Sequence, residues 1–486
     1  MEVISRKMTK QKEYPVKVVQ FGEGNFLRGF VDYMIDVANE KELFQGSVVI
    51  VKPITFGNLD RFHNQDCQYT LQLRGRVNGE PQVSTRVITC IKDAVDSYSE
   101  YKKYIALARI DSLEFIVSNT TEAGIVYDDT DEFQLEPQNS YPGKLTKFLY
   151  ERFEYFHGDK KKGLVVLPVE LIDNNGIELK KCVVKMSKKW GLSSEFLNWL
   201  EEACVFTSTL VDRIITGYPR DEAEKIWEEL GYEDNLLDTG EPFALWVIES
   251  KKDISDKLPL VKAGLPVIFT DNQKPYKQRK VRILNGAHTS FVLAAYLAGK
   301  DYVAESMQDE LICNFVKDTI YDEVIPTLSL PKEELEEFAS AVIDRFNNPY
   351  IKHSLLAISL NSVSKWKARC LPSFLEYVAM KDELPAHFTF SLASLLAFYT
   401  SDKLLEGILY GKRKEEEYQI RDDQKVLEFF VQKSKLPTRE YVEAYLKNEE
   451  FHGQDLSKVK GLTDKITSYL SEIKEFGMKK TMEKYF

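Results

Sequence analysis

The sequence predicts two parts: an α/β N-terminal domain with a mainly parallel sheet, and a mostly α-helical C-terminal domain. Three observations support this. Short apolar runs alternate with helical patterns up to about residue 275, which is typical of a parallel sheet covered on both faces. Beyond Pro275 nearly every segment repeats with helical period. At 486 residues the chain is long enough for two cores, which we assign to residues 1–275 and 276–486.

In the first part, the alternation predicts strands joined by helices. The expected strands are 16–21, 48–52, 113–118, 163–167 and 266–270, and the expected helices are 98–109, 144–156 and 177–186. Asn78-Gly79 predicts a hairpin turn between strands at 69–73 and 83–88. In the second part, helices are expected at 279–298, 301–320, 332–346, 353–367, 370–381, 388–401, 413–434 and 455–475, separated by prolines.

Gly22 and Gly24 directly follow the first expected strand, and a helical pattern begins at about Asn25. Strand, glycine turn and helix in this order bind a dinucleotide pyrophosphate, because the helix N-terminus offers free N–H groups. The third glycine of the usual motif would be residue 27, which is Leu, whereas Gly29 lies two residues later. We therefore predict a Rossmann-like domain. Its cofactor site is expected to comprise Val19, Gln20, Phe21, Gly22, Glu23, Gly24, Asn25, Phe26, Leu27 and Arg28.

The type of dinucleotide is less clear from the second strand. An acid at the end of that strand would select NAD by binding the ribose 2′-hydroxyl. Lys52 stands there instead and would favour a 2′-phosphate, while Asp60 is a more distant alternative acid.

A further cofactor contact is expected after the strand at 113–118. Asn119, Thr121 and Glu122 follow it, and residues at the carboxyl ends of parallel strands face the ligand crevice. Of these three, Asn119 is assigned to the cofactor.

The candidate catalytic residues are Lys280, Asn285 and His288. On an α-helix, at roughly 100° per residue, their side chains point to about 0°, 140° and 80°, so they share one face. Such a set can supply a proton donor, a hydrogen bond to a developing oxyanion and an orienting group for carbonyl chemistry. For an isolated Lys/Asn/His triplet, a solvated helix face is the more common explanation. No pattern such as His-Glu-x-x-His is present, so no catalytic metal is expected.

From about residue 16 to its C-terminus the chain resembles the mannitol dehydrogenase family of polyol-specific long-chain dehydrogenases. The Lys-x4-Asn-x2-His pattern of residues 280–288 is typical of the whole family, and Gln20-Phe-Gly-Glu-Gly-Asn25 favours its tagaturonate-reducing branch. Further matching segments are 119–125, 141–146, 167–176, 211–219 and 345–349.

The resemblance implies an NAD-dependent oxidoreductase that interconverts D-altronate and D-tagaturonate in hexuronate breakdown, with Lys280 as acid/base. It also implies that Lys365 contacts the substrate and that Asp212 lies near the catalytic helix, bonded to His288. A structural pair of Asp212 with Arg213 is an open alternative. Fructuronate reductase and a mannitol-type polyol dehydrogenase are alternative activities. An inactive dinucleotide-binding sensor is the alternative from another class.

Three positions depart from the family pattern: Leu171, Lys277 and Ala357 replace an oxyanion-binding Asn, a proton-path Glu and a substrate-binding Arg. The contacts to the substrate are therefore expected to differ from those that family members make to mannitol. A uronate carboxylate needs a cation or several N–H donors. Lys365, with Arg369 one helical turn later, is the candidate source; an open alternative is that both are ordinary cations on a helix surface.

Composition limits the partners and the compartment. The net charge of −11, from 65 basic and 76 acidic residues, argues against a nucleic-acid surface. The six cysteines have no Cys-x-x-Cys spacing and indicate reduced thiols in a cytoplasmic protein. No signal peptide and no apolar run of the ~20 residues that span a membrane is seen. We expect a small sugar acid as substrate, no membrane partner, and a monomer or small homo-oligomer.

Overall fold

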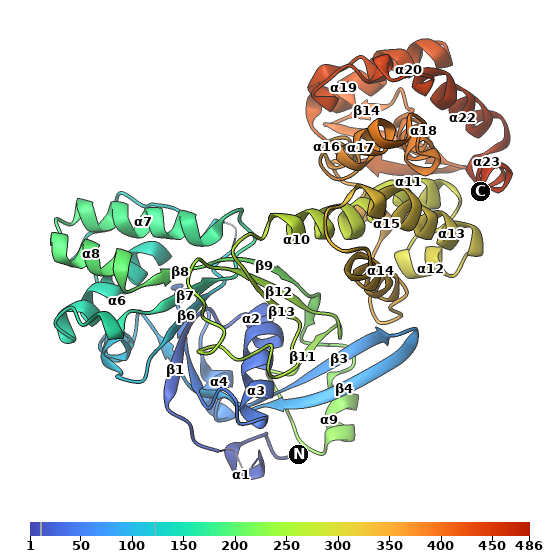
Figure 1. Ribbon diagram of the computed structural model, residues 1–486. Coiled ribbons are helices and arrows are strands. Elements are labelled where there is room, and N and C mark those ends of the chain that lie inside the picture. The colour runs from blue at the N-terminus through green and yellow to red at the C-terminus, as the bar shows by residue number, and fades with distance from the viewer. Residues whose placement is uncertain (10–11, 122) are drawn as a thin grey trace. The chain divides into compact units, whose positions relative to one another are not determined.

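The computed structural model describes residues 1–9, 12–121 and 123–486 (Figure 1). The chain divides into two compact units. The N-terminal unit comprises Met1–Arg74 and Pro81–Gln273, and the C-terminal unit comprises Gly75–Glu80 and Lys274–Phe486.

The N-terminal unit is built on a six-stranded parallel sheet with the strand order β5-β2-β1-β6-β7-β8. Its strands are β1 (Val16–Phe21), β2 (Ser47–Lys52), β5 (Ile91–Asp96), β6 (Phe115–Ser118), β7 (Val165–Pro168) and β8 (Val205–Phe206). The chain runs outward from β1 to β2 and β5 on one side, and from β6 to β7 and β8 on the other. The order reverses between β1 and β6, and open α/β sheets bind ligands at such a switch point.

Successive side chains of the strands enter two different cores, as expected for a sheet covered on both faces. Val18 belongs to one core, with Phe30 and Met34, whereas Val19 belongs to the other, with Phe148. The first core is covered by α2 (Asn25–Leu27), the π-helical turn η1 (Arg28–Asp32) and α3 (Tyr33–Glu40). The second is covered by α5 (Tyr101–Ala106), η2 (Leu107–Arg109), α6 (Tyr141–Tyr155), α7 (Asn175–Lys189) and α8 (Ser194–Glu202) (Figure 1).

The predicted hairpin is confirmed. β3 (Tyr69–Val77) and β4 (Glu80–Ile88) are neighbours in a four-stranded sheet with β10 (Ile215–Gly217) and β11 (Asp238–Gly240). Asn78 and Gly79 join them with φ of 53° and 81°, the positive values that a two-residue hairpin turn requires. The strand expected at 266–270 exists as β13 (Val267–Thr270). It lies in a separate sheet with β12 (Leu245–Glu249) and β9 (Ser208–Asp212).

Four short helices complete this unit: α1 (Arg6–Thr9), α4 (Asp60–Asn64), η3 (Lys160–Lys162) and α9 (Ala223–Leu230).

The C-terminal unit is mostly helical, as predicted. Its first helices are α10 (Lys274–Arg279), the π-helical η4 (Lys280–Asn285), α11 (Gly286–Leu297), α12 (Val303–Met307), α13 (Glu310–Asp318), η5 (Thr319–Val324), η6 (Ile325–Thr327) and α14 (Lys332–Phe346). Then follow α15 (Leu355–Ile358), α16 (Ser362–Arg369), α17 (Leu371–Lys381), α18 (Ala386–Tyr399), α19 (Gln424–Lys433), α20 (Thr438–Leu446), α21 (Glu449–His452), η7 (Leu456–Lys458), α22 (Leu462–Phe476) and α23 (Met478–Tyr485).

The prediction of one helix over 413–434 is wrong in its first part. β14 (Leu404–Leu405), β15 (Ile408–Arg413) and β16 (Glu416–Ile420) form a small antiparallel sheet, and α19 begins only at Gln424. Tyr418 and Ile420 are buried while the residue between them is exposed, which is the period of a strand.

Among the helices of the described residues, none is both long and apolar enough to cross a membrane.

Candidate active site

The glycine turn after β1 contains two glycines with different structural roles. Gly22 has a φ of +123°, and a Cβ there would lie 3.3 Å from the carbonyl oxygen of Asn119. The backbone therefore requires glycine at this position. Gly24 has an ordinary φ of −68°, is exposed, and would have no atom within 4 Å of an added Cβ. The open space at Gly24 is where a pyrophosphate would approach the first helix.

Gly29 fills the packing role of the displaced third glycine. A Cβ at Gly29 would lie 2.5 Å from Cδ1 of Ile215, so a larger residue would require the Ile215 side chain of β10 to move. In dinucleotide-binding motifs the third glycine serves such close packing. Its shift from position 27 to position 29 coincides with the π-helical turn of residues 28–32.

The ten residues predicted around this turn divide into an interior and a surface group. The side chains of Val19, Phe21 and Leu27 lie in the two cores, so only their backbone groups can face a ligand. Glu23 and Phe26 are partly exposed, and Gly24 and Asn25 are exposed.

The remaining two residues of that set are Gln20 and Arg28. Both are buried, and their side chains form hydrogen bonds within the protein. Gln20 Nε2 donates to the carbonyl of Gly22 and to Asp32 Oδ2, both at 3.2 Å. Arg28 donates to the carbonyl of Leu236 and to Asn25 Oδ1. Arg28 thereby holds the helix start rather than offering its guanidinium to solvent.

Asn119 lies on the other side of the switch point. Its backbone N–H donates to the carbonyl of Phe21 at 3.2 Å, and its Nδ2 donates to the carbonyl of Val169 at 3.0 Å. Asn119 therefore links the ends of β1, β6 and β7 beside the glycine turn. Thr121, two residues later, has a φ of 86°, and Glu122 lies outside the described residues.

Glu170, just before the family-pattern position Leu171, is buried at the same edge. Its carboxylate accepts from the backbone N–H of Thr120 at 3.1 Å and from the hydroxyls of Ser118 and Thr120. Burial nevertheless raises the pKa of Glu170 above its usual value. Leu171 itself is exposed, and its apolar side chain offers no hydrogen-bond donor in place of the Asn of the family pattern.

Lys52, at the end of β2, is enclosed by the protein. Its side chain is 1% exposed, and Nζ lies 3.0 Å from Asp96 Oδ2. Nζ also donates to the carbonyls of Ile54 at 2.6 Å and Phe56 at 3.4 Å. These three partners match the three N–H donors of an ammonium group, which leaves none for a 2′-phosphate. The alternative acid, Asp60, is the exposed first residue of α4.

Lys280 and Asn285 are the first and last residues of the π-helical turn η4, which interrupts the expected α-helix. A π-helix bonds residue i to residue i+5, so two residues five apart lie nearly above one another. The direction of about 140° expected for Asn285 relative to Lys280 is therefore wrong, because it assumed α-helical geometry. Both side chains are partly exposed, and π-helical turns of this kind are frequent at functional sites.

His288 follows in α11 and is surrounded by rings. Its imidazole stacks on Phe346 with 4.1 Å between centroids and meets His353 edge-on at 5.2 Å. Its Nε2 is buried and has no hydrogen-bond partner among the described residues. Burial lowers the pKa of His288 well below its usual value, with further contributions from His353 and from the charges of Arg345, Arg369 and Lys365. The ring is therefore neutral at pH 7, and its buried Nε2 is not engaged by any described protein group.

The two expected substrate residues lie in different units. Lys365 is in α16 of the C-terminal unit, where its Nζ donates to the carbonyl of Ile358 at 2.9 Å. Asp212 is the buried last residue of β9 in the N-terminal unit. The neighbouring Arg213 donates to the backbone carbonyls of Glu241, Phe243, Pro242 and Gly29, so its guanidinium is held by main-chain oxygens.

Sequence reasoning missed two neighbours of His288. Phe346 lies in the segment 345–349, which matches the family without an assigned role, and His353 lies in the loop after α14. Both are distant from residue 288 in sequence. Their contact with its ring depends on how α14 and the following loop pack.

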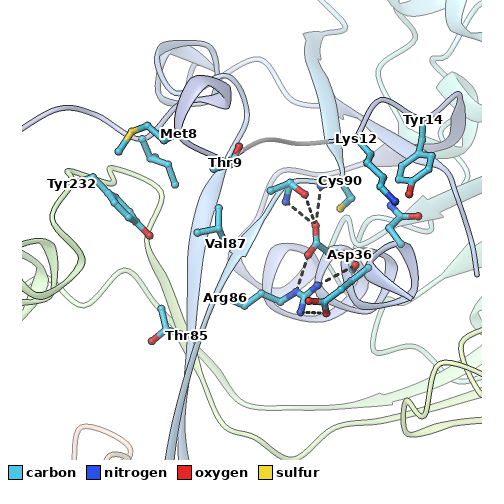
Figure 2. Close-up of a pocket in the computed structure, with 14 residues that line it drawn as sticks. Met8, Thr9, Lys12, Tyr14, Asp36, Thr85, Arg86, Val87, Cys90 and Tyr232 are labelled. Atoms are coloured by element: carbon cyan, nitrogen blue, oxygen red, sulfur yellow. Dashed lines mark hydrogen bonds and ion pairs between the residues drawn. The ribbon is translucent and has the colours of Figure 1, made fainter. Parts of the chain in front are cut away.

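A separate hollow of about 780 Å³ lies in the N-terminal unit (Figure 2). Asp36 lies in its wall and accepts from Arg86 Nε at 2.7 Å and from the backbone N–H groups of Thr89 and Cys90. Arg86 also pairs with Glu40 at 2.8 Å. Arg86 is thus shared by two carboxylates, and none of the predicted site residues lines this hollow.

The six cysteines are all free thiols. Within the described residues, no group of three or more His, Cys, Asp or Glu side chains is arranged to hold a metal ion.

A parallel sheet with a glycine turn at its switch point, followed by a helical unit carrying Lys, Asn and His together, defines a class of two-unit dehydrogenases. The chain belongs to the mannitol dehydrogenase family. The Rossmann domain of that family matches residues 16–262, and its C-terminal domain matches residues 272–474.

Curated relatives are similar over almost the full length. The altronate oxidoreductase of Escherichia coli O139:H28 (strain E24377A / ETEC) is 44% identical over 489 residues, covering 99% of both chains. The protein of the same name from Shigella flexneri matches equally well, at 44% over 99% of both chains.

Among solved structures, a D-sorbitol dehydrogenase in substrate-free form has a TM-score of 0.77 at 20% identity, covering 99% of this chain and 100% of that one. The mannitol 2-dehydrogenase of Pseudomonas fluorescens, in a ternary complex with NAD and D-mannitol, has a TM-score of 0.65 at 19% identity. It covers 100% of this chain and 99% of that one. These two structures share the fold.

Proposed function

We propose that this protein is a cytoplasmic, NAD-dependent oxidoreductase that interconverts D-altronate and D-tagaturonate. The observation that carries the proposal is the 44% identity to altronate oxidoreductases over 99% of both chains. The residues support it, because the Lys, Asn and His expected for carbonyl chemistry are all present in one helical stretch of the C-terminal unit. We further propose that the N-terminal unit binds the cofactor and the C-terminal unit the substrate.

The N-terminal unit fits a dinucleotide. A Cβ added at Gly24 would meet no atom within 4 Å, which leaves room for a pyrophosphate at the start of α2, and Asn119 lies beside the turn, where its N–H donates to the carbonyl of Phe21. Lys52 has its N–H donors occupied, which supports NAD rather than NADP. Bound NAD supplies the hydride acceptor for the alcohol carbon of the sugar acid.

In the C-terminal unit, Lys280 is proposed to take the hydroxyl proton during oxidation and to return it to the carbonyl oxygen during reduction. Asn285 donates a hydrogen bond to that oxygen as its negative charge grows. His288, neutral and with Nε2 unoccupied by protein groups, binds the oxygen or a neighbouring hydroxyl. Lys365 contacts the substrate, and Asp212 is proposed to assist His288.

The test is NADH oxidation with tagaturonate, fructuronate and fructose, using wild type and Lys280→Ala. The proposal expects the highest kcat/KM with tagaturonate and its loss in the variant. A higher value with fructuronate or fructose would instead identify a fructuronate reductase or a mannitol-type enzyme. NADH binding without turnover of any of these would identify a dinucleotide-binding sensor. Sedimentation would decide between the proposed monomer and a small homo-oligomer.

A further inference from the structure

Arg369, at the end of α16, is a half-buried cation with few protein partners. In the described part of the chain its guanidinium has one hydrogen bond, from Nη1 to Thr289 Oγ1 at 3.4 Å, and no carboxylate within ion-pair distance. A guanidinium carries five N–H donors. Burial lowers the pKa of Arg369 below its usual value, which reflects the cost of holding this charge away from water.

Other buried or half-buried arginines of the same unit are paired. Arg279 lies 2.5 Å from Glu334, Arg282 donates to Glu376 Oε1 at 2.9 Å, and Arg413 lies 2.8 Å from Asp301. In the N-terminal unit Arg152, which is fully buried, donates to four backbone carbonyls. Arg369 thus differs from these four arginines in lacking both kinds of compensation, and this difference points to a ligand.

Lys365 lies one helical turn before Arg369 on the same face of α16. Its Nζ donates to one carbonyl, that of Ile358, and no carboxylate of the described residues lies within ion-pair distance of it. Asp422 is the acidic group that acts on Lys365. The carboxylate of Asp422, however, is engaged by the hydroxyl of Tyr399 at 2.6 Å. The ammonium group therefore keeps two N–H donors for a ligand beside Arg369.

These two cations stand next to the proposed catalytic segment. α16 packs closely on α11, because a Cβ at Gly286 would lie only 3.1 Å from the carbonyl oxygen of Arg369. Thr289, the acceptor for Arg369, donates through Oγ1 to the carbonyl of Asn285 at 2.9 Å. Both cations also act electrostatically on His288, whose buried Nε2 has no described protein partner. A molecule at Asn285 and His288 therefore lies within the field of Lys365 and Arg369.

We propose that Arg369, with Lys365 beside it, binds the carboxylate of the substrate and makes the site specific for sugar acids over neutral polyols. This inference rests on the proposed function and deepens it. A planar guanidinium binds a carboxylate through two parallel hydrogen bonds, which a neutral CH₂OH group cannot replace. In a chain with a net charge of −11, two cations without carboxylate partners reverse the field locally and attract an anionic substrate.

The experiment measures binding without turnover. Altronate, and altritol as its neutral counterpart, are titrated calorimetrically into the enzyme–NADH complex for wild type, Arg369→Met and Arg369→Lys. Lys367→Met is the matched control, because Lys367 lies on the same helix and donates to the carbonyl of Glu450 at 3.2 Å. Arg369→Met should weaken altronate binding about 10- to 100-fold, as expected for lost charge-assisted hydrogen bonds. Altritol binding should change less than about threefold, and Lys367→Met should leave both unchanged.

Steady-state kinetics give an independent readout. Loss of a carboxylate grip should raise KM for tagaturonate far more than it lowers kcat, whereas loss of Lys280 should lower kcat. Arg369→Lys keeps the charge without the planar fork and should give an intermediate KM. If Arg369→Met does not fold, as judged by its thermal transition, Arg369→Lys decides: an unchanged KM overturns the inference and a raised one supports it.

Equal losses of altronate and altritol affinity would overturn the inference, as would an effect of Lys367→Met as large as that of Arg369→Met. The proposed function can fail separately. If wild type reduces another keto acid instead of tagaturonate, the same comparison with that acid and its neutral alcohol still tests Arg369. A wild type that reduces only neutral ketoses would overturn the inference together with the proposed function.

Discussion

Replacing each of the two glycines of the turn after β1 should separate the folding role from the binding role. At Gly24 the backbone has φ −68° and ψ 162°, values that any residue adopts, and an added Cβ meets nothing within 4 Å. Gly24→Val should therefore change the free energy of unfolding by no more than about 0.5 kcal/mol. Its side chain fills the space proposed for the pyrophosphate, so NADH binding should weaken by more than about tenfold, or roughly 1.4 kcal/mol.

Substitution of Gly22 should affect the free energy of unfolding, whereas substitution of Gly24 should mainly affect NADH binding. Its φ of +123° is unfavourable for a residue with a Cβ, which would also lie 3.1 Å from Leu27 Cδ1 and 3.3 Å from the Asn119 carbonyl. Backbone strain of this kind costs about 1–3 kcal/mol. Gly22→Ala should lower the free energy of unfolding by that amount, and any residual folded protein should bind NADH less tightly.

Urea unfolding and calorimetric titration with NADH, performed on both variants, give the two quantities. Unchanged NADH affinity in folded Gly24→Val would show that Gly24 only shapes the turn and that the pyrophosphate does not bind there. A loss of stability as large as that of Gly22→Ala would show that residue 24 has a folding role instead.

Three further predictions address the chemistry and the buried charges. Lys280→Ala should lower kcat by several orders of magnitude with nearly unchanged NADH affinity, because a proton donor acts in the transition state. Stopped-flow measurement of hydride transfer tests this. Wild-type rates in the variant would remove Lys280 from the mechanism. Asp96→Asn leaves the ammonium of Lys52 without its anion and should cost about 1–3 kcal/mol in urea unfolding, whereas an unchanged midpoint would show that the two carbonyl bonds suffice. Burial lowers the pKa of His452 to about 4, so its unfolded form gains a proton first as the pH falls. Wild-type stability should therefore lose up to about 1.4 kcal/mol per pH unit between roughly pH 6.5 and pH 4 relative to His452→Gln. Parallel stability curves for these two proteins would contradict the buried neutral imidazole.

The sequence by itself determined the features that depend on neighbouring residues. The apolar run of β1 and the glycines after it predicted a strand and a turn, because strand burial and positive φ are local requirements. Asn78-Gly79 predicted the hairpin for the same reason. The spacing of Lys280, Asn285 and His288 identified the helix that we propose carries the chemistry.

Only the tertiary structure decided how those residues are presented. The segment 280–285, expected to be α-helical, is a π-helical turn, and the first part of the helix expected at 413–434 belongs to a small antiparallel sheet with β15. The position of Lys52 at the end of the second strand suggested a 2′-phosphate site. The structure shows that Asp96, Ile54 and Phe56 occupy its N–H donors, so the ammonium group is not free to bind a phosphate.

The same holds for charge. Whether an arginine or a histidine is paired, neutral or available depends on groups far away in the sequence, and local periodicity carries no information about them. From the sequence alone, Arg369 is an ordinary cation on a helix. In the structure it donates to Thr289, 80 residues earlier, and this contact places it beside the Asn285–His288 segment. His288 is neutral because Phe346 and His353 pack against its ring, so its buried Nε2 lacks the water that would stabilise the charged form.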